Sequence, residues 1–158
     1  AKLFGLSTRR EDTCIGGFSM GGFGAIHTAL AYPERFGRAA AFSAALIQGQ
    51  VAAMTPKTQD PIANYAYYRH TFGEPADLPE SCRNPEYLVK KQLAEGKPLP
   101  RLFFCVGRED FLCQKNRQFR DFLTEQKVDF RYTEAPGIHD FRFVRSQLEN
   151  AMEFLTEE

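Results

Sequence analysis

The stretch TCIGGFSMGGFGAIHTALA, at residues 13–31, joins a short apolar run to a glycine-rich helical pattern. The apolar run at 13–17 predicts a buried strand. Apolar residues that recur at helical spacing over 20–31 predict a helix, which is expected to stop before Pro33 because proline disfavours helical backbone at the residue that precedes it. A buried strand that turns directly into a helix is typical of the α/β fold class.

Ser19 lies at the junction of this strand and helix, within the pattern G-x-S-x-G. The pattern places a serine on a strained turn at the end of a strand, and we expect Gly17 and Gly21 to be required because side chains there would collide with neighbouring backbone. The backbone N–H of Met20, next to the helix N-terminus, is expected to point to where an oxyanion would form. The stretch therefore predicts that Ser19 is a nucleophile.

Strands and helices alternate along most of the remaining chain. Further strands are predicted at 38–44, 101–107 and 129–135, and amphipathic helices at 113–128 and 139–158. A strand followed by a helix, three times over, indicates a mainly parallel sheet covered by helices. We expect one domain over residues 1–158.

Residues 45–100 interrupt this alternation. Two helical patterns, at 61–73 and 84–96, lie among proline-rich loops. The segment also contains four tyrosines: Tyr65, Tyr67, Tyr68 and Tyr87. An excursion of this length between two strands is often functional, so the segment is either a lid or pocket wall, or a plain covering layer.

A serine nucleophile requires a base and an acid that orients the base. In this strand-and-helix arrangement they follow in the order serine, acid, histidine, each in a loop after a later strand. The loop after the strand at 101–107 offers Glu109 and Asp110, and the loop after the last strand offers His139. On the residues alone, either carboxylate could serve.

The chain has two other histidines and four cysteines. His27 is expected to be a packed or half-exposed helix residue, and His70 a surface residue that could instead border a pocket. Cys105 or Cys113 could act as a thiol nucleophile near His139, although the first is expected in the core and the second in a loop or at a helix start.

Three stretches together resemble one esterase family: IGGFSMGGFGAIHTALAYPERFGRAAAFSAAL at 15–46, CVGREDFL at 105–112 and APGIHDFRF at 135–143. This family lies within the α/β-hydrolases and includes tributyrin esterases, acetyl esterases, S-formylglutathione hydrolases and feruloyl esterases. The resemblance implies hydrolysis of short-chain acyl esters through a covalent acyl-serine intermediate. It also implies that Ser19 is the nucleophile, Asp110 the acid and His139 the base.

Members of this family carry further residues before the segment that matches position 1. We therefore expect the N-terminal strands, and with them the second backbone donor of the oxyanion hole, to be missing from this C-terminal portion of the fold. The strand at 13–17 would then be a bare edge, which invites self-association with a second copy. Other interpretations are an acyltransferase or thioesterase of the same fold, or a non-catalytic fragment or subunit that needs its missing segment.

Composition limits the partners that we expect. The 20 basic and 20 acidic residues balance, so we expect neither nucleic acid nor a membrane surface as a partner. The expected partner is a small-molecule ester substrate. We expect no cofactor, because the sequence shows no phosphate-binding loop. We expect no metal, because no His, Cys and Asp residues have the spacing of metal ligands. The cysteines contain no C-x-x-C pair, which favours reduced thiols and a cytoplasmic location.

Overall fold

Four parallel strands form the central sheet of this computed structural model, which describes residues 5–157. In chain order and in spatial order they are β1 (Cys14–Phe18), β2 (Arg38–Phe42), β3 (Arg101–Gly107) and β4 (Phe130–Ala135). Each strand pairs in parallel with the next one along the chain. The central strands β2 and β3 are apolar almost throughout because both of their faces are covered. The predicted parallel α/β architecture is confirmed.

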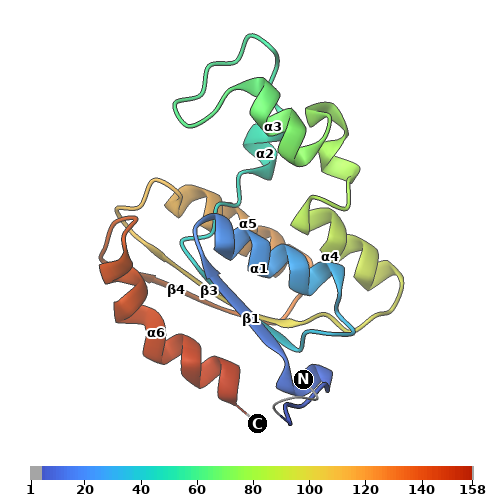
Figure 1. Cartoon of the computed structure of the whole chain (residues 1–158), viewed down its shortest axis with the longest axis vertical. Coiled ribbons are helices and arrows are strands. Elements are labelled where there is room, and N and C mark those ends of the chain that lie inside the picture. The colour runs from blue at the N-terminus through green and yellow to red at the C-terminus, as the bar shows by residue number, and fades with distance from the viewer. Residues whose placement is uncertain (1–4, 158) are drawn as a thin grey trace.

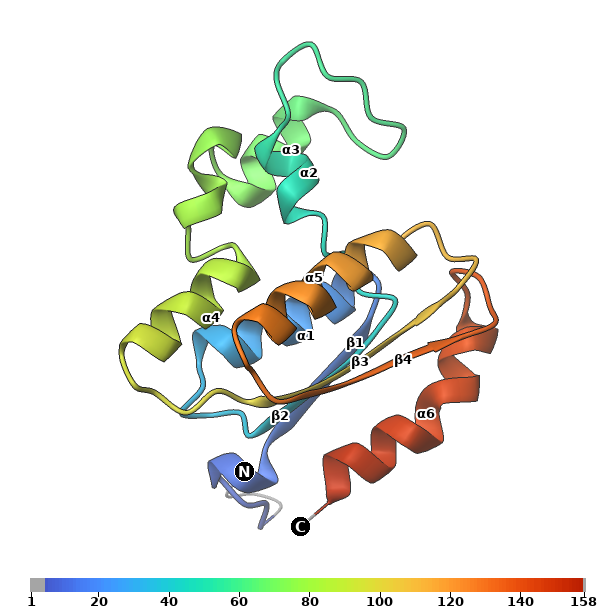
Figure 2. The same cartoon turned by 180° about the vertical axis from the view of Figure 1, so that it is seen from behind.

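Helices cover both faces of the sheet (Figures 1 and 2). One face packs against α1 (Met20–Ala31), α4 (Pro85–Ala94) and α5 (Cys113–Glu125), and the other packs against α6 (Phe141–Thr156). Successive strand residues point to opposite faces. Phe104 of β3 accordingly lies in the core with α1 and α5, and its neighbour Phe103 packs with α6.

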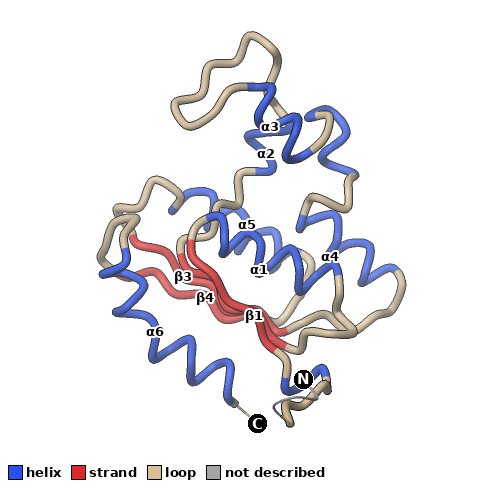
Figure 3. Tube along the Cα trace, viewed as in Figure 1, coloured by secondary structure: helices blue, strands red, loops and turns tan. Residues whose placement is uncertain are grey.

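The segment between β2 and β3 carries α2 (Gln48–Ala52), α3 (Tyr65–Phe72), a 3-10 helix, η3 (Pro75–Glu80), and then α4. Figure 3 shows α2 and α3 standing away from the sheet, beyond α1 and α5. They have a small core of their own, made of Val51, Met54, Tyr68, Phe72 and Leu78. The helix α2 was not predicted, because five residues are too few to show a helical period.

Two expectations concern the chain as a whole: self-association through a sheet edge, and a single domain. Among the described residues β1 pairs on one side only, with β2, and self-association through its free edge stays a prediction. The single-domain assignment likewise stays a prediction.

A short 3-10 helix, η2 (Arg10–Asp12), precedes β1. Among residues 5–157, no helix combines the length and the apolar character that crossing a membrane requires.

Candidate active site

Ser19 sits on a sharp turn between the last residue of β1 and the first residue of α1. Its φ of 57° and ψ of −117° lie outside the regions that a non-glycine residue ordinarily adopts. Backbone hydrogen bonds hold this turn in place: the Ser19 N–H donates to the Phe42 carbonyl at 2.9 Å, and the Ala45 N–H donates to the Ser19 carbonyl at 3.0 Å. The strained turn is therefore anchored to the end of β2.

Of the two motif glycines that flank Ser19, only Gly17 excludes a side chain in this structure. A Cβ on Gly17 would collide with the backbone of Gly21, as expected. A Cβ on Gly21 itself would meet no atom within 4 Å, so the prediction that Gly21 excludes a side chain is wrong. The second tight position is Gly22, where a Cβ would lie 3.1 Å from both the Ala44 Cα and the Gly17 carbonyl oxygen.

The structure brings Ser19, His139 and Asp110 into one hydrogen-bonded chain. His139 Nε2 lies 2.9 Å from Ser19 Oγ, and His139 Nδ1 lies 2.8 Å from Asp110 Oδ2. An ionised carboxylate only accepts hydrogen bonds, so Nδ1 carries the proton in this arrangement and Nε2 is free to accept from the serine hydroxyl. The three side chains thus have the connectivity that a serine nucleophile needs.

Asp110, and not Glu109, contacts the histidine ring. The Asp110 side chain is fully buried, and its second oxygen accepts a hydrogen bond from the Leu112 N–H at 2.8 Å. The Glu109 carboxylate instead accepts from the Gly137 N–H at 2.6 Å, which ties the acid loop to the loop that carries His139. The two neighbouring carboxylates therefore have separate partners.

Aromatic rings enclose the histidine from two sides. The ring centroids of Phe18 and Phe111 each lie 4.7 Å from that of His139, and Phe141 lies 5.0 Å from Phe18. The hydrogen bond from His139 to Asp110 is shielded from water because the Asp110 side chain is fully buried, and this shielding strengthens the interaction. Sequence reasoning did not single out these phenylalanines, although each is within two residues of a predicted site residue.

Met20 is the first residue of α1, so its N–H has no acceptor within the helix. This N–H lies in the turn next to Ser19 and at the positive end of the helix dipole. It is thus placed as a donor for negative charge that develops beside the serine.

A cavity of about 900 Å³ opens beside Ser19. Its walls come from α1, from the loop after β3 and from the excursion that contains α2 and α3. The lining residues are Ser19, Met20, Phe23, His27, Ala45, Ile47, Ile62, Ala63, Asn64, Tyr67, Tyr68, Thr71, Phe72, Arg83, Phe111 and Leu112. Of the two interpretations that the sequence left open, the structure therefore supports the pocket wall.

The remaining candidates lie outside the hydrogen-bonded chain. His70 is exposed and does not line this cavity. His27 is half-buried, with its ring stacked on Phe23 and its Nε2 lying 2.8 Å from the Cys82 carbonyl oxygen. Cys105 is buried in β3, and burial raises the pKa of its thiol to about 12.

Burial likewise raises the pKa of the Cys113 thiol at the start of α5. A thiolate is the nucleophilic form of cysteine, so neither buried thiol fits the alternative role. No group of three or more His, Cys, Asp or Glu side chains among residues 5–157 is arranged to hold a metal ion.

Comparison with known proteins identifies the class to which this fold and site belong. The Esterase family model matches residues 4–155, and the chain therefore belongs to this esterase family, whose solved neighbours are serine hydrolases of the α/β-hydrolase type. An acetyl esterase of Caldicellulosiruptor saccharolyticus is 36% identical over 154 residues, which cover 98% of this chain and 58% of that protein.

Two solved structures from Staphylococcus aureus are also similar. The fluorophosphonate-binding serine hydrolase FphF superposes with a TM-score of 0.83 at 28% identity, over 99% of this chain and 59% of that one. An S-formylglutathione hydrolase gives a TM-score of 0.80 at 29% identity over the same shares. The chain thus spans less than two thirds of the length of these relatives.

Proposed function

We propose that this chain carries the catalytic centre of a carboxylic-ester hydrolase that acts on short-chain acyl esters through an acyl-serine intermediate. The observation that carries the proposal is the hydrogen-bonded chain from Ser19 through His139 to Asp110 at the edge of a largely apolar cavity. Membership of the esterase family and the similarity to an acetyl esterase support it.

In the first half of the reaction, Ser19 Oγ attacks the ester carbonyl carbon while His139 Nε2 takes the hydroxyl proton. The Met20 N–H donates to the oxyanion that forms on the carbonyl oxygen. The bond to the alcohol oxygen then breaks, and the proton on Nε2 passes to the leaving alcohol. Asp110 keeps Nδ1 protonated and stabilises the transient imidazolium.

In the second half, a water molecule takes the place of the alcohol. His139 removes a proton from this water as it attacks the acyl carbon, and then returns the proton to Ser19 Oγ as the acid leaves.

A thioester substrate, or transfer of the acyl group to another alcohol, would use the same residues, and both remain predictions. We propose likewise that the partner of this site is a small-molecule ester, and neither nucleic acid nor a membrane. The four unpaired cysteines support our proposal of a reducing, cytoplasmic location.

Labelling with a fluorophosphonate probe tests the proposal directly. Intact-mass measurement of the 158-residue chain is expected to show one added phosphonyl group, and Ser19→Ala, checked for folding by circular dichroism, is expected to show none. If the parent is folded and does not react with the probe, the proposal that this chain has an assembled catalytic site is contradicted. The alternative, a non-catalytic fragment or subunit, would then be favoured. Labelling of both proteins would place the nucleophile elsewhere.

A further inference from the structure

Arg83 is the one charged side chain among the described residues that line the cavity beside Ser19, apart from the titratable His27. No lysine, aspartate or glutamate of residues 5–157 is among them. Tyr68 is no source of negative charge either, since burial, together with a hydrogen bond to Asp60, raises the pKa of its hydroxyl to about 12. The cavity therefore combines apolar walls with a single permanent positive charge.

This positive charge is not neutralised by the protein. Within residues 5–157 the Arg83 guanidinium forms no ion pair and donates no hydrogen bond, although its backbone N–H donates to Ser81 Oγ at 3.2 Å. Arg69, on the neighbouring helix α3, behaves differently because its Nε lies 2.6 Å from the Glu74 carboxylate. Arg83 is exposed, so its guanidinium lies at the open edge of the cavity, where it is free to pair with an anionic group of a ligand.

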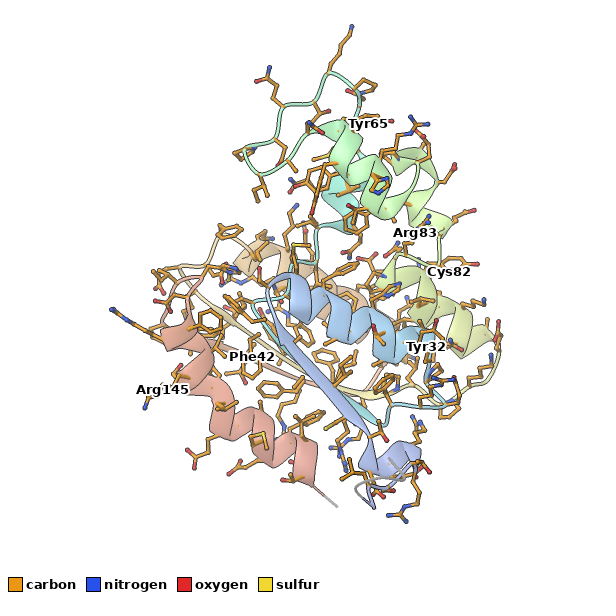
Figure 4. The ribbon with its side chains drawn as sticks, in the orientation of Figure 1. Tyr32, Phe42, Tyr65, Cys82, Arg83 and Arg145 are labelled. Carbon is orange, nitrogen blue, oxygen red and sulfur yellow. The ribbon has the colours of Figure 1, made fainter. Side chains whose placement is uncertain are left out.

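Arg83 lies between α1 and the end of α3. The His27 ring, whose Nε2 lies 2.8 Å from the Cys82 carbonyl oxygen, links the segment just before Arg83 to α1. On the other side, a Cβ on Gly73 would lie only 2.5 Å from Arg83 Nη1, so the guanidinium occupies space that any side chain there would fill. Figure 4 shows Cys82 and Arg83 together between α3 and α4.

The helix α1 provides a measure of the distance between Ser19 and the His27–Cys82 contact that precedes Arg83. Ser19 precedes the first residue of α1, and His27 lies two turns further along, about 10 Å down the helix axis at 1.5 Å per residue. Phe23 and Phe72 line the cavity with these residues. A ligand that extends from Ser19 along α1 toward Arg83 therefore passes largely apolar side chains.

We propose that Arg83 binds a carboxylate at the remote end of the ester, so that the preferred substrates are esters in which an apolar chain separates a free carboxylate from the carbonyl that Ser19 attacks. The fork of the guanidinium matches a carboxylate in a bidentate geometry. A phosphate monoester would bring nearly two negative charges against one positive charge, so a carboxylate matches the single charge of Arg83 better. This inference rests on the proposed ester hydrolysis and adds its substrate class.

Two esters of equal acyl length test the proposal: the mono-4-nitrophenyl ester of suberic acid, which has a free carboxylate, and 4-nitrophenyl octanoate, which has none. In Arg83→Gln, kcat/KM for the suberate ester is expected to fall about 10- to 100-fold, because a hydrogen-bonded ion pair is lost. The octanoate value is expected to stay within about twofold of the parent. Arg83→Lys keeps the charge without the fork and should give an intermediate loss.

Arg145→Gln is the matched control, since it makes the same change in charge on α6, beyond the opposite face of the sheet (Figure 4). It is expected to leave both substrates unaffected. An equal fall for both esters in Arg83→Gln would mean that the arginine only supports the fold, and no change for either ester would mean that it binds no carboxylate. Either result overturns the proposal.

A binding measurement separates this inference from the proposed esterase activity. The Ser19→Ala chain is titrated with suberic acid monomethyl ester and with methyl octanoate, and binding is followed by ligand-observed NMR. Binding of the acid that weakens at least tenfold on adding Arg83→Gln supports the site even if the chain hydrolyses nothing. Equal binding of the two ligands, or binding of neither, contradicts it.

Discussion

His139 Nε2 lies 2.9 Å from Ser19 Oγ, although their strands, β4 and β1, are at opposite edges of the four-stranded sheet. Two strands separate them, so the loop after β4 has to reach back across the end of the sheet. The loop after β3 supports it on the way: the Arg108 N–H donates to the Ala135 carbonyl, and a Cβ on Gly107 would collide with Gly137. Parallel pairing makes this possible because the carboxyl ends of all strands lie along one edge.

Asp110→Asn is expected to lower the rate of ester hydrolysis by about 10⁴ while the protein stays folded, because an amide facing Nδ1 favours the histidine tautomer that cannot accept the serine proton. The measurement is kcat on a 4-nitrophenyl acetate substrate, or the rate of phosphonylation where turnover is slow. Glu109→Gln is the matched control. Its amide oxygen can still accept from the Gly137 N–H, so activity should stay within about tenfold of the parent. An equal loss in both variants would argue against Asp110 as the orienting acid.

Asn116→Ala is expected to destabilise the chain by about 1–2 kcal/mol, because two buried hydrogen bonds between segments are lost. The fully buried Asn116 amide donates to the Ala44 and Leu112 carbonyls, both at 2.9 Å, and so joins the segment after β2 to the acid loop. The free energy of unfolding from urea titration measures the effect. Asn150→Ala, on the exposed side of α6, should change it by less than about 0.5 kcal/mol. Similar losses in both variants would show that the two hydrogen bonds of the Asn116 amide add no particular stability.

Local signals in the sequence predict the arrangement around Ser19 well. The glycines and the change from an apolar run to a helical period are confined to a few neighbouring residues, and β1, the turn and α1 follow them closely. His139 could be assigned to the same edge of the sheet because parallel strands end together. The choice of Asp110 over Glu109 needed the family resemblance, since adjacent loop residues point in directions that only the folded turn determines.

Other features of the site depend on contacts between distant segments and carry no local signal. Gly22 is tight partly because Ala44 packs on it, and Gly21 is open because no other residue does. Arg83 borders the cavity through a contact between His27 and Cys82, 55 residues apart. Neither the hydrophobic period nor the turn residues of the sequence indicate such contacts between distant segments. These contacts form only when the chain folds and its distant segments pack on α1.

Acid is expected to destabilise the fold partly through Glu134. Two hydrogen bonds from Arg117, at 2.7 and 2.8 Å, are the main reason that the pKa of this carboxyl is lowered to about 2. Its ionised form is favoured in the folded state, so this contribution is present above the unfolded pKa of about 4.5 and is lost as the pH falls toward 2.

Chemical denaturation of the parent and of Glu134→Gln between pH 7 and pH 2.5 measures this contribution. The parent should be more stable at pH 7 by about 1 kcal/mol, and the difference should shrink below pH 4.5. Glu125→Gln, at the end of α5, is the control for loss of one carboxylate. A difference between the parent and Glu134→Gln that stays constant over this range would rule out the linkage.

Thiol accessibility separates the serine mechanism from a cysteine mechanism. Cys14 and Cys82 are exposed, whereas Cys105 and Cys113 are buried with raised thiol pKa values. Iodoacetamide at pH 7.5 is therefore expected to add two groups to the native chain and four in urea, as counted by intact mass. The doubly alkylated protein should still react with the fluorophosphonate at the parent's rate. Neither exposed sulfur takes part in the hydrogen bonds that link Ser19, His139 and Asp110. Rapid native alkylation of Cys105 or Cys113 that abolishes ester hydrolysis would instead favour a thiol nucleophile.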